Sequence, residues 1–151
     1  MAKFVYRLQN VLNLKQMLEN QEKAEFALAA ARESEERDKL TQLLVRRADY
    51  QKKLADAVDS DKIDKKEIIF LRNADTTMKS LIRDQMFAVK RAQNALELER
   101  QKLDEARKER KTHERLKEKA FDDFRMELNA EDNKANDELT SYTYGSAKKV
   151  N

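Results

Sequence analysis

Apolar residues recur at steps of three and four along residues 4–58, the first of two long stretches without a helix-breaking residue. They are Leu14, Met17, Ala24, Leu28 and Ala31, followed by Leu40, Leu44, Ala48, Ala55 and Val58. An α-helix presents the same face at this period. Pairs such as Glu19 and Lys23 have the i, i+4 spacing of helical ion pairs, with the acid first. The pattern predicts a helix over 4–58 that packs through this apolar face.

The second stretch has a more regular repeat. From Met78, alternating steps of four and three reach Ile82, Gln85, Val89, Ala92, Leu96, Glu99, Leu103, Ala106, Arg110, His113, Lys117, Ala120 and Phe124. This heptad alternates large with small or polar residues, which lets two helices approach closely. Turn and β-branched residues follow Leu139. They predict a helix over 64–138 and a flexible tail over 140–151.

Residues that cap helices and form turns cluster between the two stretches. Asp59, Ser60, Asp61 and Asp64 lie here, and Asp64 is followed three residues later by Glu67, the spacing of a capping box. The cluster predicts a turn at 59–63. The expected fold is all-α, a long antiparallel two-helix coiled-coil hairpin with unequal arms and a flexible C-terminal tail, in one domain over 1–139.

The unequal arms leave part of the second helix without a partner. At a rise of 1.5 Å per residue the helices are about 80 Å and about 110 Å long. Folding the chain about residue 61 places Phe4 near residue 118, so residues 119–139 are expected to extend beyond the first helix. They carry Phe121, Phe124, Met126 and Leu128. Unpaired apolar side chains of this kind predict a contact with another protein.

Apolar residues are also dense at the N-terminus and beside the turn. Nine of the fifteen residues from Phe4 to Leu18 are apolar, and they cover more than one helical face. A single partner helix cannot bury them all, so a third segment, a second copy of the chain or another protein is expected to cover the excess. Near the turn, Tyr50 and Leu54 are about level with residues 70–78, where a second apolar patch is expected.

Composition narrows the possible functions. The 151 residues include no proline, cysteine or tryptophan, a single glycine (Gly145) and 40% charged residues. This excludes a β-sandwich, a βαβ nucleotide-binding domain and a disulfide-stapled module. The net charge is only +3, from 32 basic and 29 acidic residues, which favours ordered helices over disorder.

No residue cluster has the pattern of a catalytic, metal or cofactor site. His113 is the only histidine, and the Asp59–Asp61–Asp64 run lacks the glycine and the final glutamate of a calcium loop. We therefore expect no enzyme activity, no metal and no cofactor. The sequence has no membrane span and no signal peptide, so a cytoplasmic protein is expected.

A basic stretch raises the possibility of nucleic-acid binding. Residues 107–119 contain seven Lys or Arg residues and three Glu residues. In a basic zipper this stretch precedes the heptads, whereas here it follows them, and acidic residues interrupt it. Docking on an acidic protein is the favoured interpretation, and we expect no binding to nucleic acid.

The sequence resembles the FliJ family of flagellar export proteins. The resemblance rests on Phe4-Val-Tyr-Arg-Leu8 with Val11, Leu12 and Leu14, on Asp49-Tyr50-Gln51 with Leu54, and on Ile69-Phe70-Leu71 with Ala74. It covers residues 1 to about 139, and the N-terminal pattern is its most specific part. Ala74 and Leu81 depart from the family pattern, which has a larger residue at the first position and a polar one at the second.

The resemblance implies a component of the type III export apparatus that resembles the stalk of rotary ATPases. Such a protein inserts into the ring of the export ATPase, stimulates it, and links it to the export gate at the inner face of the cell membrane. Carried over to this sequence, the ATPase end would comprise Phe4, Tyr6, Leu8, Val11, Leu12, Phe121, Phe124 and Leu128. The gate-facing surface would comprise Tyr50, Leu54, Phe70, Ala74, Thr77 and Leu81.

The partners implied are the export ATPase hexamer, the membrane gate protein and, as a further possibility, export chaperones, with no direct insertion into the membrane and a monomer when free. Two alternatives remain open from the residues alone. One is a structural coiled coil that self-associates through Phe4–Leu18. The other is a helical protein that binds nucleic acid through 107–119.

Overall fold

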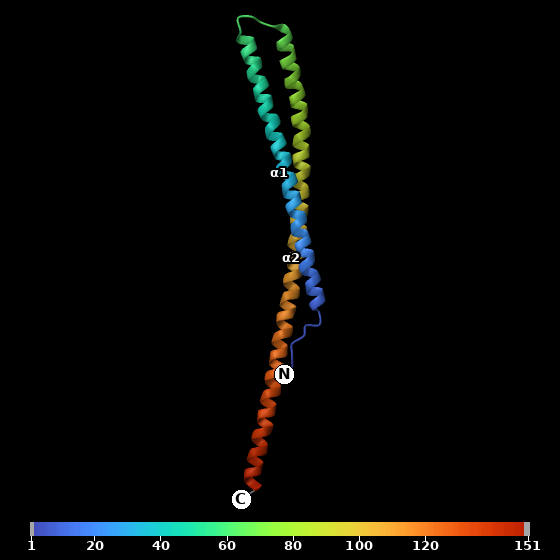
Figure 1. Ribbon diagram of the computed structural model, residues 1–151, viewed down its shortest axis with the longest axis vertical. Coiled ribbons are helices and arrows are strands. Elements are labelled where there is room, and N and C mark those ends of the chain that lie inside the picture. Colours follow the sequence, from blue (N-terminus) through green and yellow to red (C-terminus); the bar gives the residue numbers. More distant parts are fainter. Residues whose placement is uncertain (1, 150–151) are drawn as a thin grey trace. The chain divides into compact units, whose positions relative to one another are not determined.

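The protein consists of two long helices joined by a short connection (Figure 1). The computed structural model describes residues 2–149, and the side chains of residues 2–145. Helix α1 spans Gln9–Asp59 with 51 residues, and α2 spans Lys65–Lys149 with 85 residues. No strand occurs in the described residues. The predicted fold class, an all-α hairpin of two packed helices with unequal arms, is confirmed.

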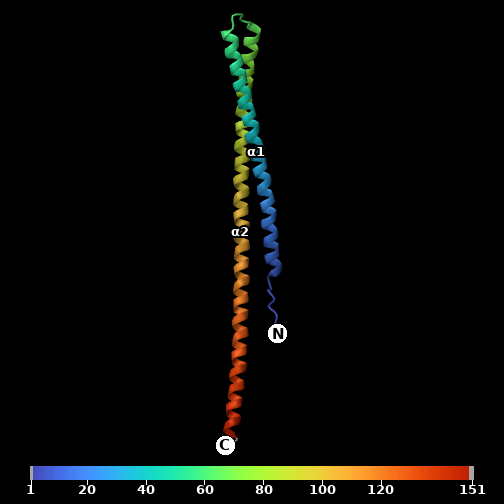
Figure 2. The same cartoon turned by 60° about the vertical axis from the view of Figure 1, so that its left-hand side comes forward.

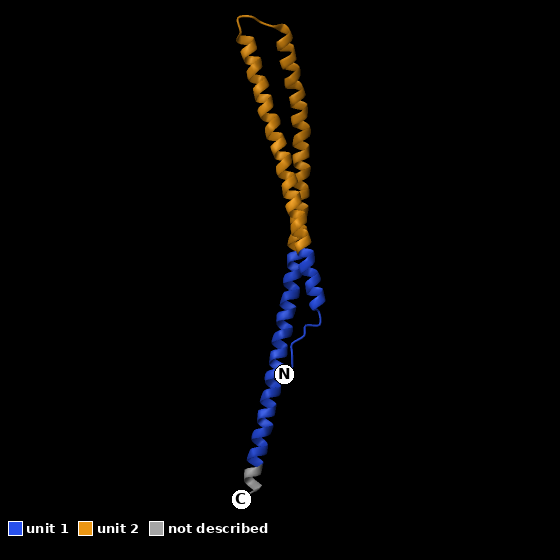
Figure 3. Cartoon of the chain, in the orientation of Figure 1, with its two compact units in different colours: residues 1–19, 106–151 blue, residues 20–105 orange. Residues whose placement is uncertain are grey.

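Each helix contributes to two compact units (Figure 3). Unit 2 comprises residues 20–105, including the connection at 60–64 and the antiparallel segments of α1 and α2 that it joins. These segments lie side by side in both views (Figures 1 and 2). Unit 1 comprises residues 1–19 and 106–151, in which the N-terminal segment and the start of α1 pack along α2.

The connection at 60–64 and the start of α2 at Lys65 lie one residue after the predicted turn at 59–63 and the predicted helix start at 64. Asp64 is the N-cap of α2, since its Oδ1 accepts a hydrogen bond from the Lys66 N–H at 3.0 Å and its C=O accepts one from the Ile68 N–H at 3.2 Å. Glu67 adds a negative charge to the first turn, where the helix dipole favours it. The capping residue therefore determines where α2 begins.

We expect Asp64→Ala to lower the free energy of unfolding by about 1 kcal/mol, because the Lys66 N–H loses its acceptor. Urea unfolding followed by circular dichroism measures this change. Asp61→Ala is the matched control, since Asp61 lies in the same connection and forms no hydrogen bond or ion pair with a described residue. Equal effects of the two substitutions would contradict the capping role of Asp64.

The heptad predicted for α2 is confirmed along its whole length. Each of its fourteen positions from Met78 to Phe124 is buried or partly buried. Met78, Ile82, Val89 and Leu103 are among the most buried side chains in the structure. Apart from Ala120 and Phe124, which adjoin the non-helical residues 3–8, these positions form the α2 side of the seam, by which we mean the residues of each helix that face the other helix.

The face predicted for α1 is wrong. Of the ten apolar residues in the predicted repeat only Leu40 lies in the seam, whereas Leu14, Met17, Leu28, Leu44 and Val58 are about half exposed or more. The α1 side of the seam follows a different heptad: Leu12, Lys15, Glu19, Glu22, Phe26, Ala29, Glu33, Glu36, Leu40, Leu43, Arg47, Tyr50, Leu54 and Ala57. Six of these fourteen residues are charged.

Polar partners on α2 account for this choice of face. In unit 2, Arg47 Nε donates to Asp75 Oδ1 at 3.1 Å, and Gln85 Nε2 donates to the backbone C=O and the Oε2 of Glu36 at 2.9 and 2.5 Å. An apolar α1 face in this position would leave Gln85 without these acceptors and Asp75 with only the exposed Lys79 as a partner, at a cost that exceeds a modest gain in apolar burial. The α1 seam is thus selected by its polar complement on α2.

Both helix ends also differ from the prediction. Helix α1 begins at Gln9, not at residue 4, and residues 2–8 form a non-helical segment. Helix α2 continues to Lys149, beyond the predicted end at 138, so the flexible tail predicted over 140–151 is wrong for residues 140–149, and its last two residues lie outside the described part of the chain. A lone glycine at 145 costs a helix only about 1 kcal/mol, and extending an existing helix is easy because nucleation has already occurred. The Thr143 hydroxyl is also accommodated, since it donates to the Leu139 C=O at 2.8 Å.

Candidate protein-binding surfaces

The N-terminal segment packs its first aromatic residue onto α2 within unit 1. The Phe4 ring centroid lies 5.2 Å from that of Phe121, edge to face, and 5.5 Å from that of Phe124. These distances are typical of favourable aromatic pairs. We call Phe4, Phe121 and Phe124 the aromatic cluster.

The aromatic cluster corrects the expectation that α2 residues after 118 have no internal partner. A non-helical residue can advance up to about 3.3–3.6 Å along the chain, compared with 1.5 Å in a helix. Because residues 2–8 are not helical, Phe4 reaches further along α2 than a helical N-terminus would. Phe121 and Phe124 are therefore partly covered from within the chain.

Other residues predicted for the ATPase end divide into buried and exposed groups. Leu12 is buried in the seam at 3% exposure, and Tyr6, Val11 and Leu128 are partly buried. Leu8 and Phe121 remain 46% and 42% exposed. The structure thus brings the N-terminal and α2 members together, but only part of the predicted set is available to a partner.

An open cavity of about 730 Å³ adjoins the aromatic cluster in unit 1. It is lined by residues 3–8, Ala120 and Phe124. Lys3 and Arg7 are exposed and place positive charge beside this apolar surface, while the Tyr6 hydroxyl is buried without a hydrogen-bond partner. The cavity can accept an apolar side chain of another protein, and the cations beside it favour an acidic one.

The sequence did not single out several exposed apolar residues of unit 1 as binding residues. Val5 and Met126 are 78% and 71% exposed, and Leu14 and Met17 face solvent as well. The wrong α1 heptad had placed Leu14 and Met17 inside the seam. The density of apolar residues between Phe4 and Leu18 indicated that some of them would remain uncovered, and Met126 belongs to the stretch 119–139 that was expected to be unpaired.

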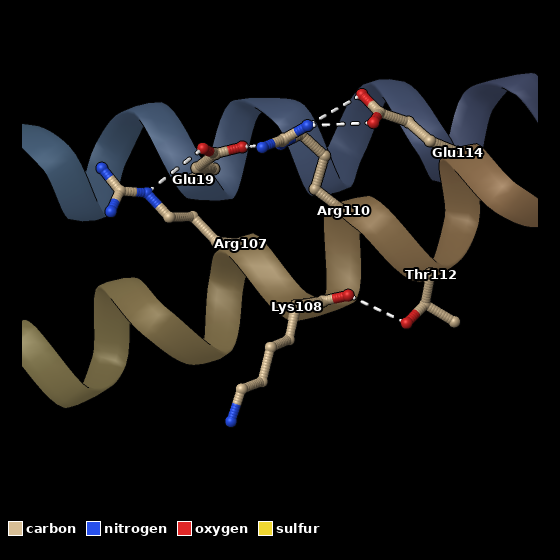
Figure 4. A network of polar contacts seen from close by, with 6 residues as sticks. All are labelled: Glu19, Arg107, Lys108, Arg110, Thr112 and Glu114. Atoms are coloured by element: carbon tan, nitrogen blue, oxygen red, sulfur yellow. Dashed lines mark hydrogen bonds and ion pairs between the residues drawn. The ribbon is translucent and has the colours of Figure 1, made fainter.

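A charge network lies in the seam of unit 1 (Figure 4). The Glu19 side chain is only 6% exposed and accepts a hydrogen bond from Arg110 Nε, while Arg107 Nε lies 3.7 Å from its other oxygen. Arg110 Nη1 donates to both Glu114 oxygens at 3.0 Å. Hydrogen bonds to Glu114 and Glu19 raise the pKa of the Arg110 guanidinium above its ordinary value. We call Glu19, Arg107, Arg110 and Glu114 the Glu19 network.

The Glu19 network explains why the α2 heptad becomes polar after residue 109. It also changes the interpretation of the basic stretch at 107–119, because two of the seven cations in that stretch, Arg107 and Arg110, are paired with the buried Glu19 carboxylate. Next to them, Lys15 Nζ donates to Glu109 at 2.8 Å, which lowers the pKa of that carboxyl. Cations that are already neutralised within the chain contribute little to binding phosphates, which weakens the nucleic-acid alternative.

The residues predicted to face the export gate lie in unit 2 and occupy two environments. Tyr50 and Leu54 belong to the α1 seam and are partly buried, and Lys53 Nζ lies 6.0 Å from the centre of the Tyr50 ring. Leu54 also lines an open cavity of about 420 Å³ together with Ala55, Val58 and residues 51, 59 and 75. These α1 residues offer an apolar edge rather than a fully exposed patch.

The α2 members of the gate-facing set share one side of their helix. Phe70, Ala74, Thr77 and Leu81 follow the i, i+4, i+7, i+11 spacing of a single helical face. Phe70 is 64% exposed and Leu81 42% exposed, whereas Ala74 is partly buried. Ile63 and Ile69 are also exposed apolar residues, and the predicted gate-facing set does not include them. We call Phe70, Ala74, Thr77 and Leu81 the α2 face.

No group of three or more His, Cys, Asp or Glu side chains in the described residues is arranged to hold a metal ion. His113 occupies a partly buried seam position, and its Nδ1 atom has no hydrogen-bond partner. None of the described helices combines the length and the hydropathy needed to cross a membrane.

Comparison with known proteins identifies the family. A family model described as "Flagellar FliJ protein" matches residues 4–149, which is nearly the whole chain. Searches of curated proteins and of solved structures return no significant match. The match agrees with the two-helix fold and with the N-terminal pattern that begins at Phe4. The chain therefore belongs to the FliJ family and is a component of flagellar protein export.

Proposed function

We propose that the protein is the stalk of the export apparatus, with unit 1 inserted in the ring of the export ATPase and the α2 face of unit 2 directed to the export gate. Unit 1 stimulates ATP hydrolysis, and the whole protein is held at the inner face of the cell membrane by its partners. The protein itself has no catalytic role. Export chaperones are further candidate partners.

The observation that carries this proposal is the exposed apolar surface of unit 1. Val5, Leu8, Phe121 and Met126 are each more than 40% exposed, and Val5 and Leu8 line the cavity of about 730 Å³. Exposure of so many apolar side chains to water is unfavourable. A protein partner that covers them removes apolar area from water, which makes the free energy of binding more favourable. The aromatic cluster holds the non-helical segment in place, so the surface is formed before a partner binds.

A second feature of unit 1 supports insertion into a ring. Every described side chain of α2 from residue 129 to residue 145 is exposed. This solvent-exposed helical segment includes Leu139, Tyr142 and Tyr144, each about 70% exposed. A helix that no part of its own unit covers is available to a partner along its whole circumference.

Substituting one exposed residue at each surface tests the proposal. Val5→Asp is expected to weaken binding to the cognate export ATPase about tenfold and to reduce the stimulation of ATP hydrolysis, because a carboxylate would be buried in the contact. Phe70→Asp is expected to weaken binding to the gate protein about tenfold and to leave ATPase stimulation unchanged.

Each substitution is the matched control for the other, because both residues are more than 60% exposed and neither change removes a buried contact. Binding is measured by titration calorimetry with each purified partner, and stimulation by the rate of phosphate release. The proposal fails if the wild-type protein neither binds nor stimulates the ATPase. The assignment of surfaces fails if Val5→Asp and Phe70→Asp exchange effects.

A further inference from the structure

A groove between α1 and α2 in unit 2 belongs to neither of the surfaces discussed above. It has a volume of about 270 Å³, and its floor includes Ala29 of α1 and Ala88, Ala92 and Ala95 of α2. Because alanine side chains are small, they leave a recess between the two helices that a larger side chain can enter. The groove can therefore accept a large apolar side chain from another molecule.

A large apolar side chain that could fill such a recess lies on the same face. Leu28 lines the groove, yet it is 54% exposed and points away from the seam position taken by Ala29. A surface that carries a protruding leucine next to an alanine-floored recess is complementary to itself. Self-complementarity is what a two-fold symmetric contact between identical chains requires.

Five charged residues line the groove. Glu36 and Glu99 have partners within the chain, Gln85 and Lys102, and Arg91 lies on α2. The two remaining charges, both on α1, are complementary to themselves. Glu25 and Arg32 line the groove on α1, one on each side of Leu28 and Ala29. They are seven residues apart and so lie on the same side of the helix. Among the described residues, neither has a hydrogen-bond or ion-pair partner. Each charge is therefore available to an opposite charge on another molecule.

We propose that this face binds a second copy of the chain, with the two α1 helices antiparallel about a two-fold axis between residues 28 and 29. Residues equidistant from that axis face each other, so Leu28 of each copy enters the alanine-floored groove of the other. The same axis places Glu25 of each copy opposite Arg32 of the other. One symmetry operation thus places a leucine in each groove and pairs Glu25 and Arg32 of each copy with Arg32 and Glu25 of the other.

The contact is small, with one leucine and two ion pairs on each side of the axis. We expect a dissociation constant on the order of 100 µM, in the range of weak, transient interfaces. The chain is then monomeric at micromolar concentration and pairs where it is locally concentrated. The proposal does not depend on the stalk function, since it involves neither the aromatic cluster nor the α2 face.

Charge reversal provides the test. Sedimentation equilibrium of the full chain between about 5 and 500 µM should show monomer–dimer exchange for the wild type. Glu25→Arg and Arg32→Glu, each alone, should weaken the dimer at least tenfold, because like charges then meet twice. An equimolar mixture of these two variants should restore dimerisation, since every contact in the mixed dimer joins opposite charges. The chain that carries both substitutions should also dimerise.

Leu28→Ala should weaken the dimer as well, whereas Leu44→Ala, at a similarly exposed α1 position outside the groove, should have no effect. Circular dichroism checks that each variant is as helical as the wild type. A chain that stays monomeric at 500 µM overturns the proposal. A dimer that the single charge reversals leave intact, or that the mixture does not restore, also overturns it and would indicate self-association through another surface, such as Phe4–Leu18.

Discussion

Glu19→Ala is expected to lower the free energy of unfolding by about 2 kcal/mol, a large effect for a single charged side chain. The substitution removes the one buried carboxylate that faces Arg110 and Arg107. Glu114 remains with Arg110, but it lies on the same helix and is more exposed, so it compensates only in part. The free energy lost is mainly that of the interactions that the buried Glu19 carboxylate makes across the seam with Arg110 and Arg107.

Urea unfolding followed by circular dichroism measures this effect. Glu35→Ala is the matched control, because Glu35 is an exposed glutamate of the same helix with no ion pair among the described residues, and it should change the free energy by less than about 0.5 kcal/mol. Replacing Glu19 and Arg110 together by leucine should recover most of the loss, since an apolar pair in the seam needs no polar partner. If Glu19→Ala is as mild as the control, the Glu19 network does not stabilise the seam.

Phe4→Ala is expected to release the N-terminal segment from α2 while the helices remain folded. Phe4 is the residue of this segment whose ring contacts both Phe121 and Phe124, and losing the contacts should cost about 2 kcal/mol of local stability. Since residues 2–8 are not helical, the circular dichroism spectrum should hardly change. Hydrogen exchange at residues 2–8 should become faster, because these residues would open more often.

The same variant separates preorganisation from simple exposure. If partners of unit 1 need the segment held on α2, Phe4→Ala should weaken ATPase binding even though it uncovers Phe121 and Phe124. Val5→Ala is the matched control for the exchange experiment, because Val5 is 78% exposed in the same segment and outside the ring contacts. Unchanged exchange in Phe4→Ala would show that the aromatic cluster does not hold the segment.

The α2 seam was predictable from the sequence, but the α1 seam was not. In α2 the large apolar residues Met78, Ile82, Val89 and Leu103 recur at heptad positions and decide the buried face by themselves. In α1 nine of the ten residues of the predicted repeat face solvent, and only eight of the fourteen seam residues are apolar, so apolar residues alone do not decide the buried face. The buried α1 face is determined by pairwise contacts such as that between Arg47 and Asp75, which are 28 positions apart in the sequence and invisible to a local pattern.

The candidate surfaces were predictable in composition but not in arrangement. The density of apolar residues at Phe4–Leu18 and the aromatic pair at 121 and 124 identified unit 1 correctly as rich in uncovered apolar side chains. That Phe4 itself covers the pair follows from the non-helical start of the chain, and no residue near Phe4 marks a helix boundary in the sequence. The cap at Asp64, in contrast, is a local interaction, and its sequence signal placed the connection correctly.

The exposed α2 segment at 129–145 has a consequence for how such a protein changes over generations. None of its described side chains packs into a core, so substitutions there that keep the helix carry almost no folding cost. Residues of the Glu19 network have no such freedom, because a change in one requires a compensating change in another. Substitutions in the exposed segment are therefore constrained only by its binding partner. Substitutions in the Glu19 network are tolerated only when the paired residue changes as well.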